Sequence, residues 1–293
     1  MKSMLERIQD GETLLGDGAM GTMLQAAGLT AGTCPELWCV ENPSAVAAVH
    51  RAYHDAGSRI LETNSFGGSA YKLAHYGLES RVTEINRAAA ALAREAVGDD
   101  GYVMASVGPT GAFLEPLGDE TQEAFYEAFR LQITALEEGG ADAVIVETMA
   151  AAEEAAVAVR AARENTRLVV VASFTFDRLA ADGPHTMMAL TPERAAAEAL
   201  AAGAHIVGAN CGMDPAGMQQ VIAAYRAAAP GVPLIAMPNA GMPEVVDGET
   251  VFKQTPEEMA RLVPALRSAG ADIIGGCCGT TPPHIAAMKQ AIG

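Results

Sequence analysis

Residues 139–164 read GGADAVIVETMAAAEEAAVAVRAARE and contain the unit from which the rest of the chain is built. A Gly-Gly pair precedes a short apolar run, Ala141–Glu147, which has the length and β-branched content of a buried strand. The following stretch, 149–164, is rich in alanine and carries Arg or Glu at intervals, which is typical of a helix with a small-residue packing face. The segment therefore predicts one strand–helix unit that is entered through a glycine helix cap.

The same alternation recurs along the whole sequence and yields eight strand–helix units. The predicted strands are Thr13–Gly16, Arg59–Thr63, Tyr102–Val107, Ala141–Glu147, Arg167–Thr175, Ala204–Asn210, Pro233–Pro238 and Ala271–Gly276, and the helices that follow them are 43–57, 79–97, 119–139, 149–164, 191–202, 214–229, 255–269 and 282–291. Eight such units in 293 residues predict an α/β fold, a closed (β/α)8 TIM barrel that spans residues 1–293 as a single domain.

The main alternative to the barrel is a doubly wound open sheet, which usually has fewer strands and a phosphate-binding glycine loop after the first of them. Residues 16–21, GDGAMG, have a similar glycine spacing. However, Asp17 stands inside this loop, where its negative charge would repel a phosphate. The sequence therefore favours the closed barrel.

The composition excludes several classes of protein. Half of the residues are apolar and 19% are charged, so the chain is not disordered. There are 19 Lys and Arg against 36 Asp and Glu, and the net charge of −17 argues against binding nucleic acid. No apolar stretch reaches the roughly 18 residues of a membrane span, and the N-terminus turns acidic too early for a secretory signal. Five cysteines are too few for a disulfide framework, so we expect a cytoplasmic protein with reduced thiols.

Polar side chains stand where the predicted strands end. In a (β/α)8 barrel these carboxyl ends meet at one face, which carries the active site. The residues at these positions are Asp17, Glu62, Thr63, Asn64, Glu147, Ser173, Asn210 and Asn239. We therefore expect a polar site at the mouth of the barrel.

Three cysteines also stand at strand ends. Cys211 follows the sixth predicted strand, and the adjacent pair Cys277 and Cys278 follows the eighth. In a barrel only one strand separates these ends, so the three sulfurs can converge and bind a thiophilic metal, for which Zn²⁺ is the first candidate. Three protein ligands leave one coordination position open, which is the catalytic pattern. Cys34 and Cys39 lie away from strand ends, and we expect them to pack as small apolar side chains.

The histidines offer no comparable cluster. We expect His50, His54 and His75 at the surface of the first helix and the loop beyond it. His284 is close in sequence to Cys278, but it stands in the first turn of the last predicted helix. Packing at that helix start is therefore expected, rather than a role as a fourth metal ligand.

Four motifs give the chain a resemblance to a known family. They are Gly16–Thr22 (GDGAMGT), Glu62–Phe66 (ETNSF), Asn210–Gly212 (NCG) and Gly275–Pro282 (GGCCGTTP). Together they resemble the homocysteine S-methyltransferase family, and most of all the homocysteine-binding barrel module of cobalamin-dependent methionine synthase. The resemblance extends from about residue 10 to the end of the chain, and GGCCGTTP is its most specific motif.

The resemblance implies a (β/α)8 barrel with one zinc ion on three cysteines, a carboxylate pair for the substrate ammonium group, and backbone groups for the substrate carboxylate. By motif matching, the implied residues are Cys211, Cys277 and Cys278 for zinc, Asp17 and Glu147 for the ammonium group, and Gly18, Ala19 and Met20 for the carboxylate. From their places at strand ends, we expect Asn64 and Ser173 to be further substrate-binding residues. Asn239 matches an asparagine that can occupy the open zinc position when no substrate is bound.

The implied activity is zinc-dependent methyl transfer to the thiol of homocysteine, which gives methionine. The sequence ends after one barrel, so the donor is expected to be a methylcorrinoid (cobalamin) protein encoded separately. Three alternatives stay open: a small sulfonium donor such as S-methylmethionine, another acceptor thiol or pathway, and a non-catalytic zinc-binding module. The third would need a fourth protein ligand, and no fourth cysteine stands at a strand end. The loop 183–190 is apolar where the family pattern is more polar, and it could change the shape of the pocket for the acceptor thiol or of a docking surface.

Overall fold

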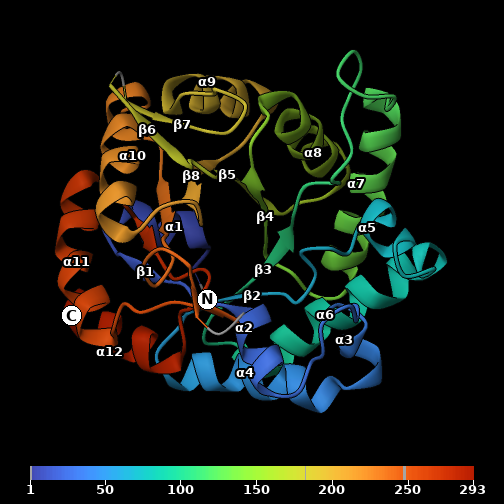
Figure 1. The fold of residues 1–293 in the computed structure, drawn as a ribbon, viewed down its shortest axis with the longest axis horizontal. Helices are drawn as coiled ribbons and strands as arrows, with labels where there is room; N and C mark the ends of the chain where they lie inside the picture. The colour runs from blue at the N-terminus through green and yellow to red at the C-terminus, as the bar shows by residue number, and fades with distance from the viewer. Residues whose placement is uncertain (1, 182, 247–248) are drawn as a thin grey trace.

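Eight parallel strands form a ring at the centre of the computed structural model, which describes residues 2–181, 183–246 and 249–293 (Figure 1). Their order around the ring is β1-β12-β9-β8-β5-β4-β3-β2, and a hydrogen bond from Arg59 N to Leu15 O, 2.8 Å long, links the first strand to the second. The bounds are β1 (Leu14–Leu15), β2 (Ile60–Glu62), β3 (Tyr102–Val107), β4 (Ala143–Met149), β5 (Val169–Phe174), β8 (Ile206–Asn210), β9 (Leu234–Met237) and β12 (Ile273–Ile274). The predicted (β/α)8 barrel is confirmed.

Eight long helices surround the ring, one after each strand (Figure 1). They are α4 (Pro43–Asp55), α6 (Val82–Val97), α7 (Gln122–Glu138), α8 (Ala152–Asn165), α9 (Pro192–Ala202), α10 (Pro215–Ala228), α11 (Pro256–Ala269) and α12 (Pro282–Ile292). Local signals explain their ends. Thr191 and Thr255 cap helices that have proline in the first turn, and Gly203 and Gly270 end those helices in the left-handed conformation, with φ of 106° and 112°.

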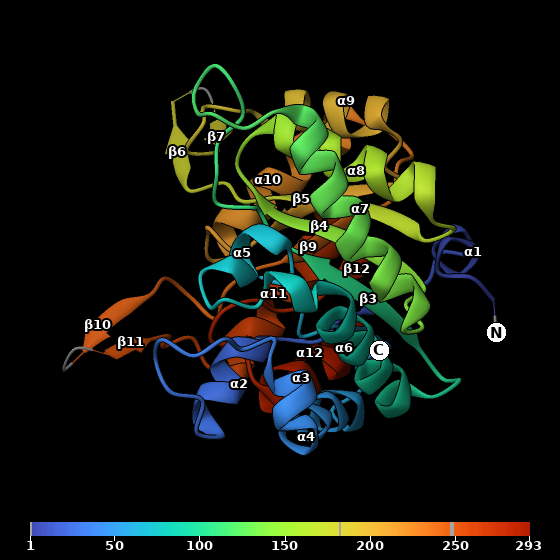
Figure 2. The same cartoon turned by 90° about the vertical axis from the view of Figure 1, so that its right-hand side faces the viewer.

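A short N-terminal helix that the sequence analysis did not predict, α1 (Met4–Gln9), closes the bottom of the barrel. Met4 and Ile8 are buried against the inward-facing side chains of the strands, among them Ile60 and Ile145. Figure 2 shows α1 at the end of the molecule opposite the loops that follow the strands. Because the lower interior is filled in this way, only the other end of the barrel is open to substrates.

The remaining short elements all lie in the loops at the open end (Figure 2). They are the helices α2 (Met20–Ala26), α3 (Trp38–Glu41), α5 (Ala70–Ala74) and η1 (Glu79–Arg81), and the hairpins β6 (Arg178–Ala180) with β7 (Gly183–His185) and β10 (Glu244–Val246) with β11 (Glu249–Val251). Elements of three to seven residues have little stability of their own, so the sequence pattern alone does not reveal them.

The expected surface position of His50 is wrong. Its side chain is completely buried on the inner face of α4, and burial lowers its pKa to about 4, so the ring is neutral at physiological pH. Among the described residues, no helix combines the length and the apolarity that crossing a lipid bilayer requires.

Candidate functional site

Three cysteine sulfurs converge at the open end of the barrel. Cys211 directly follows β8, Cys277 and Cys278 lie in the loop after β12, and all three sulfurs lie within 4.8 Å of one another. The Sγ atoms of Cys211 and Cys278 are 3.8 Å apart. A tetrahedral zinc ion with Zn–S bonds of about 2.3 Å separates its sulfur ligands by about 3.8 Å. The donor set therefore fits a thiophilic metal in both chemistry and spacing.

The backbone around the cysteines turns the sulfurs to the same side. Cys211 itself is in the left-handed region, with a φ of 56°, and Gly212 and Gly279 also have positive φ. The loop after β12 is fastened to its neighbour, because Cys277 N donates to Pro238 O over 2.8 Å. The glycines that flank the adjacent pair thus allow both sulfurs to face Cys211.

The proximity of the three sulfurs also changes their acidity. Hydrogen bonds from the Cys277 and Cys278 thiols lower the pKa of Cys211 to about 3, and a hydrogen bond from Asn239 contributes. The hydrogen bond with Cys211, together with burial, raises the pKa of Cys278 to about 11. The cluster therefore holds a thiolate, the form in which cysteine binds metals.

The other two cysteines take no part in this cluster, as expected. Cys34 and Cys39 are both buried, and burial raises the pKa of each thiol to about 12. Cys34 donates to a carboxylate oxygen of Glu36 over 3.2 Å, and Cys39 contacts the side chain of Asn64 at 3.4 Å. Both behave as packed, protonated thiols.

His284 also has the expected structural role. Its Nδ1 lies 2.8 Å from the hydroxyl oxygen of Thr281 in a capping arrangement at the start of α12, and its Nε2 lies 2.9 Å from Gln254 O. Both ring nitrogens are thus engaged, and the metal-binding group found among the described residues consists of the three cysteines alone.

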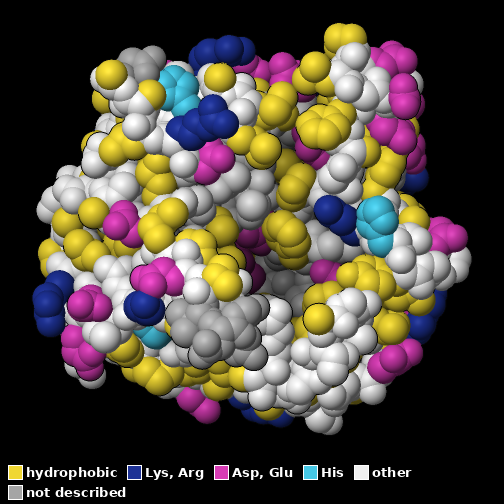
Figure 3. Space-filling model, in the orientation of Figure 1, with side chains coloured by type: hydrophobic (Ala, Val, Ile, Leu, Met, Phe, Trp, Pro, Cys, Tyr) yellow, Lys and Arg dark blue, Asp and Glu magenta, His cyan; other side chains and the backbone are white. Residues whose placement is uncertain are grey.

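Three carboxyl groups form the second part of the site, two of them buried and that of Glu62 half-buried. They belong to Asp17 after β1, Glu62 at the end of β2 and Glu147 in β4. Asp17 Oδ2 accepts a hydrogen bond of 2.9 Å from Glu62 N, whereas Asp17 Oδ1 and Glu62 Oε1 have no partner among the described residues. Acidic side chains are visible in the depth of the central hollow in Figure 3. Two buried acceptor oxygens are therefore left for a ligand that donates hydrogen bonds.

These carboxyl groups resist ionisation together. Burial, and the charge of neighbouring carboxylates, raise the pKa of Asp17 and of Glu62 well above their usual range. Burial raises the pKa of Glu147 to about 7, although a hydrogen bond from Ser106 opposes the effect. A cation with several N–H donors would relieve both the missing hydrogen bonds and the charge repulsion, so the cluster suits an ammonium group.

The backbone predicted to bind a substrate carboxylate lies beside the cysteine sulfurs and the three carboxyl groups. Ala19 N donates to Thr280 Oγ1 over 3.1 Å, and the hydroxyl of Tyr53 donates to Ala19 O and to Thr280 O. These hydrogen bonds fasten the loop after β1, which contains Gly18, Ala19 and Met20, to the loop that carries Cys277. Sulfur-binding and backbone groups are thus brought next to each other.

Gly18 has no room for a side chain in this arrangement. A Cβ atom there would lie 2.5 Å from Thr280 Oγ1 and 3.0 Å from the Tyr53 ring. We expect Gly18→Ala to lower the free energy of unfolding by about 1–3 kcal/mol, as overpacking does. Gly21→Ala is the matched control, because nothing lies within 4 Å of its Cβ position and alanine favours the helix. Urea denaturation of both variants measures the difference, and equal stability would contradict the fit described.

The other predicted substrate residues occupy different surroundings. Ser173 is completely buried and donates over 2.7 Å to Asn210 Oδ1, so it adjoins the site through that asparagine. The Asn64 amide donates over 2.8 Å to Pro35 O and thereby holds the loop after β1. Asn239 is buried next to the cysteines, with its Oδ1 unpartnered among the described residues.

Five residues of the site were not assigned to the substrate or the metal from the sequence: Tyr53, Glu62, Ser106, Asn210 and Thr280. Glu62 and Asn210 stand at strand ends and were expected at the polar mouth, but no particular role was predicted for them. Ser106, by contrast, lies within β3, where its hydroxyl donates to Glu147 Oε1. Nothing in the sequence distinguishes such a serine from any other serine in a strand.

Glu62 Oε1 is buried and has no partner among the described residues, which makes the substrate-free protein less stable, because a buried polar group without a hydrogen bond is costly. Its raised pKa means that its stability contribution is present below pH 4 and is lost as the pH rises towards the folded-state pKa. We therefore expect Glu62→Gln to raise the free energy of unfolding by about 1–2 kcal/mol at pH 8 and by less at pH 5. Denaturation at both pH values measures this, and a gain that shrinks at higher pH would contradict it.

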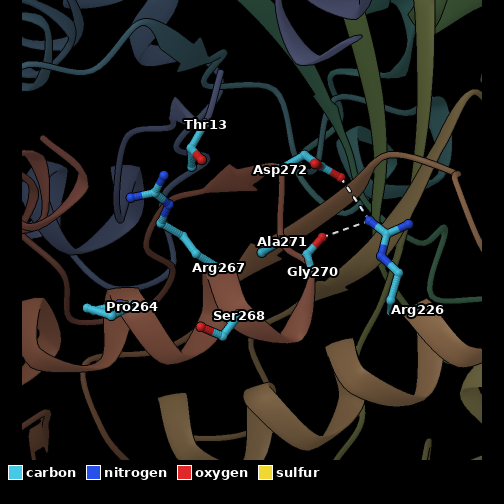
Figure 4. A pocket seen from close by; sticks show the side chains of 8 residues that line it. All are labelled: Thr13, Arg226, Pro264, Arg267, Ser268, Gly270, Ala271 and Asp272. Carbon is cyan, nitrogen blue, oxygen red and sulfur yellow. Dashed lines mark hydrogen bonds and ion pairs between the residues drawn. The ribbon is translucent and has the colours of Figure 1, made fainter. Parts of the chain in front are cut away.

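A second hollow lies at the opposite face of the barrel (Figure 4). Arg226 projects into it and donates to Gly270 O over 2.8 Å and to Asp272 Oδ2 over 3.1 Å. Asp272 Oδ2 also accepts from Leu234 N. These contacts tie helices to the amino ends of strands, so they explain the stability of this face rather than a reaction.

Comparison with known proteins identifies the family. Residues 14–292 match the family model described as homocysteine S-methyltransferase, which confirms the resemblance seen in the motifs. Methionine synthase from Mycobacterium tuberculosis is 31% identical in an alignment 293 positions long, which covers 95% of this chain. The match covers 24% of that relative, so the chain spans about a quarter of the length of the methionine synthase.

Solved structures agree with the fold. The homocysteine methyltransferase MmuM from Escherichia coli, in its metallated form, superposes with a TM-score of 0.81 and 28% identity, and the match covers 98% of this chain and 99% of that one. A methyltransferase from Methanosarcina mazei, at 12% identity and a TM-score of 0.61, shares the fold.

Proposed function

The chain belongs to the homocysteine S-methyltransferase family, and from this premise we propose that it transfers a methyl group to the thiol of homocysteine and releases methionine. The observation that carries the proposal is the position of the three cysteine sulfurs beside the buried carboxyl cluster at one mouth of the barrel. A thiophilic metal and an ammonium acceptor are the two groups that an amino-acid thiol requires for binding.

We assign the metal to Cys211, Cys277 and Cys278, with zinc as the ion. When bound there, zinc would lower the pKa of a coordinating substrate thiol and leave one position open for its sulfur. The half-buried cysteines keep this position accessible from the mouth. Since such thiols must stay reduced, a cytoplasmic location suits the site.

The chain's own groups orient the other end of the substrate. Asp17 and Glu147 accept hydrogen bonds from its ammonium group, and backbone around Gly18, Ala19 and Met20 holds its carboxylate. Asn64, Ser173 and Asn239 complete the proposed substrate site. With both ends held, the sulfur is directed towards the open end, so that a methyl carbon can approach it in line.

We propose a methylcorrinoid on a separate protein as the methyl donor, and the rim of the mouth supports a large partner. Nine of the ten exposed large apolar side chains among the described residues lie in loops or hairpins that follow strands at this end. They are Phe66, Tyr76, Phe113, Leu117, Leu179, Met187, Met188, Met242 and Val245. An apolar rim around a polar site is typical of a docking surface.

A small sulfonium such as S-methylmethionine is the second candidate donor. The chain covers 99% of the length of the homocysteine methyltransferase MmuM but 24% of the length of the mycobacterial methionine synthase. The carboxyl groups at the mouth also suit a positively charged donor.

The donor and the acceptor are tested together with the purified, zinc-loaded protein. Homocysteine is supplied with free methylcobalamin in one reaction and with S-methylmethionine in another, and methionine is quantified. We expect methionine from methylcobalamin, whereas methionine from S-methylmethionine alone would identify a sulfonium-dependent enzyme. If neither donor yields methionine while other thiols are methylated, the proposed acceptor is wrong.

A further inference from the structure

Asn210, the last residue of β8, uses every hydrogen-bonding position of its side chain. Its Oδ1 accepts from Thr148 N over 2.9 Å and from Ser173 Oγ over 2.7 Å. Its Nδ2 donates to Glu147 Oε2 over 2.9 Å and to Thr148 Oγ1 over 2.7 Å. Because a backbone N–H can only donate, the bond from Thr148 N fixes the orientation of the amide. The side chain is 1% exposed, so water does not compete for these bonds.

The partners of Asn210 come from two other strands, β4 and β5, and support two strained positions. Thr148 in β4 has a φ of 58°, and Cys211, the residue after Asn210, has a φ of 56°. Left-handed backbone is unfavourable for both residue types and persists only where surrounding contacts enforce it. Asn210 supplies two such contacts to Thr148 and is covalently joined to Cys211. Ser173 in β5, the strand between β4 and β8, holds the amide from a third direction.

These contacts join the two halves of the site. Glu147, the acceptor for the substrate ammonium group, is held by the same side chain whose neighbour, Cys211, belongs to the sulfur cluster. A substrate that binds at both points must span the separation that this asparagine sets. The number of methylene groups between the α-carbon and the sulfur of the substrate therefore has to match this separation.

Resting on the proposed function, we propose that Asn210 is a positioning residue that fixes the spacing between Glu147 and Cys211 and so selects the length of the amino-acid thiol. Homocysteine has two methylene groups between its α-carbon and its sulfur, and cysteine has one. A rigid spacing accepts the first and leaves either the ammonium or the sulfur of the second unpaired. The mismatch of a single methylene is worth roughly 10- to 200-fold in discrimination.

Asn210→Asp tests the inference with almost no change in volume. The new side chain keeps an acceptor for Thr148 N and Ser173, but it places a carboxylate oxygen against Glu147 where Nδ2 had donated. Asn86→Asp is the matched control, because Asn86 is also completely buried and donates two hydrogen bonds of 2.8 Å, to Gly68 O and Val82 O, away from the sulfur cluster and the three carboxyl groups.

Calorimetric binding of three ligands to the zinc-loaded proteins supplies the measurement: homocysteine, cysteine, and 4-mercaptobutyrate, which lacks the amino group. In Asn210→Asp we expect homocysteine affinity to fall about 10- to 100-fold, towards that of 4-mercaptobutyrate, and the preference over cysteine to fall about 10-fold. Affinity for 4-mercaptobutyrate and one zinc per chain should be retained. In Asn86→Asp the order of the three affinities should match that of the wild-type protein.

Two results would overturn the inference: an unchanged preference for homocysteine in Asn210→Asp, or a parallel loss for all three ligands with zinc still bound. If this variant does not fold or loses zinc, Ser173→Ala, which removes one of the four hydrogen bonds, is measured with the same ligands, and an unchanged preference there has the same meaning. A wild-type protein that does not bind homocysteine would overturn the proposed function as well. If the wild-type protein transfers the methyl group but Asn210→Asp keeps the wild-type preference for homocysteine over cysteine, only the role of Asn210 is contradicted.

Discussion

Replacing Cys277 by alanine is expected to release the metal and to reduce methyl transfer to homocysteine by at least about a thousand-fold, because two cysteines remain where three are needed for a catalytic zinc site. The Cys277 sulfur lies within 4.8 Å of both other sulfurs, so its removal opens one corner of the donor set. Elemental analysis of protein purified under reducing conditions measures zinc per chain, and methionine formation measures activity.

The control for this experiment is Cys34→Ala. Cys34 is buried, its thiol contacts Glu36, and it does not belong to the sulfur cluster. The variant should retain one zinc per chain and most of the wild-type activity. Zinc that remains bound at full stoichiometry in Cys277→Ala would show that the metal is held elsewhere. A wild-type protein without zinc would contradict the proposed mechanism, although the fold would stand.

Asp17→Asn is expected to lower kcat/KM for homocysteine by about 100-fold, mainly through a higher KM, because it removes a charged acceptor for the ammonium group. Asp17 is 1% exposed, and its Oδ1 has no partner among the described residues, so the substrate is the group that would satisfy it. For 4-mercaptobutyrate, which lacks the amino group, the variant and the wild-type protein should have similar KM values. Steady-state kinetics with both thiols provides the comparison.

Asp142→Asn is the matched control, since Asp142 is an aspartate at the opposite face. Its Oδ2 accepts from Val103 N over 2.8 Å and pairs with Arg94. Loss of its charge should lower the free energy of unfolding by about 1 kcal/mol without a change in KM. Asp17→Asn should instead leave stability equal or higher, because it removes a buried carboxyl whose Oδ1 has no partner among the described residues. A proportional KM increase for both thiols in Asp17→Asn would exclude the proposed contact with the ammonium group.

The sequence by itself determined the parts of this protein that depend on local patterns. Strand–helix alternation, threonine–proline helix starts and glycine helix ends are local signals, each contained in a segment of about 15 residues. The eight units could therefore be recognised directly from the sequence. The order of these units then places every strand end at one face, and Cys211, Cys277 and Cys278 were assigned to a shared site on that ground. The sulfurs lie together as the barrel requires.

Contacts between residues distant in sequence were decided by the tertiary structure alone. Closure of the ring brings Glu62 to Asp17, places Ser106 from the middle of a strand against Glu147, and lets the helix residue Tyr53 reach Thr280. The buried position of His50 and the plugging of the barrel by α1 arise in the same way. A periodic pattern records which face of an element is apolar, but the neighbour of a given side chain depends on how strands are staggered around the ring, and no local signal specifies that stagger.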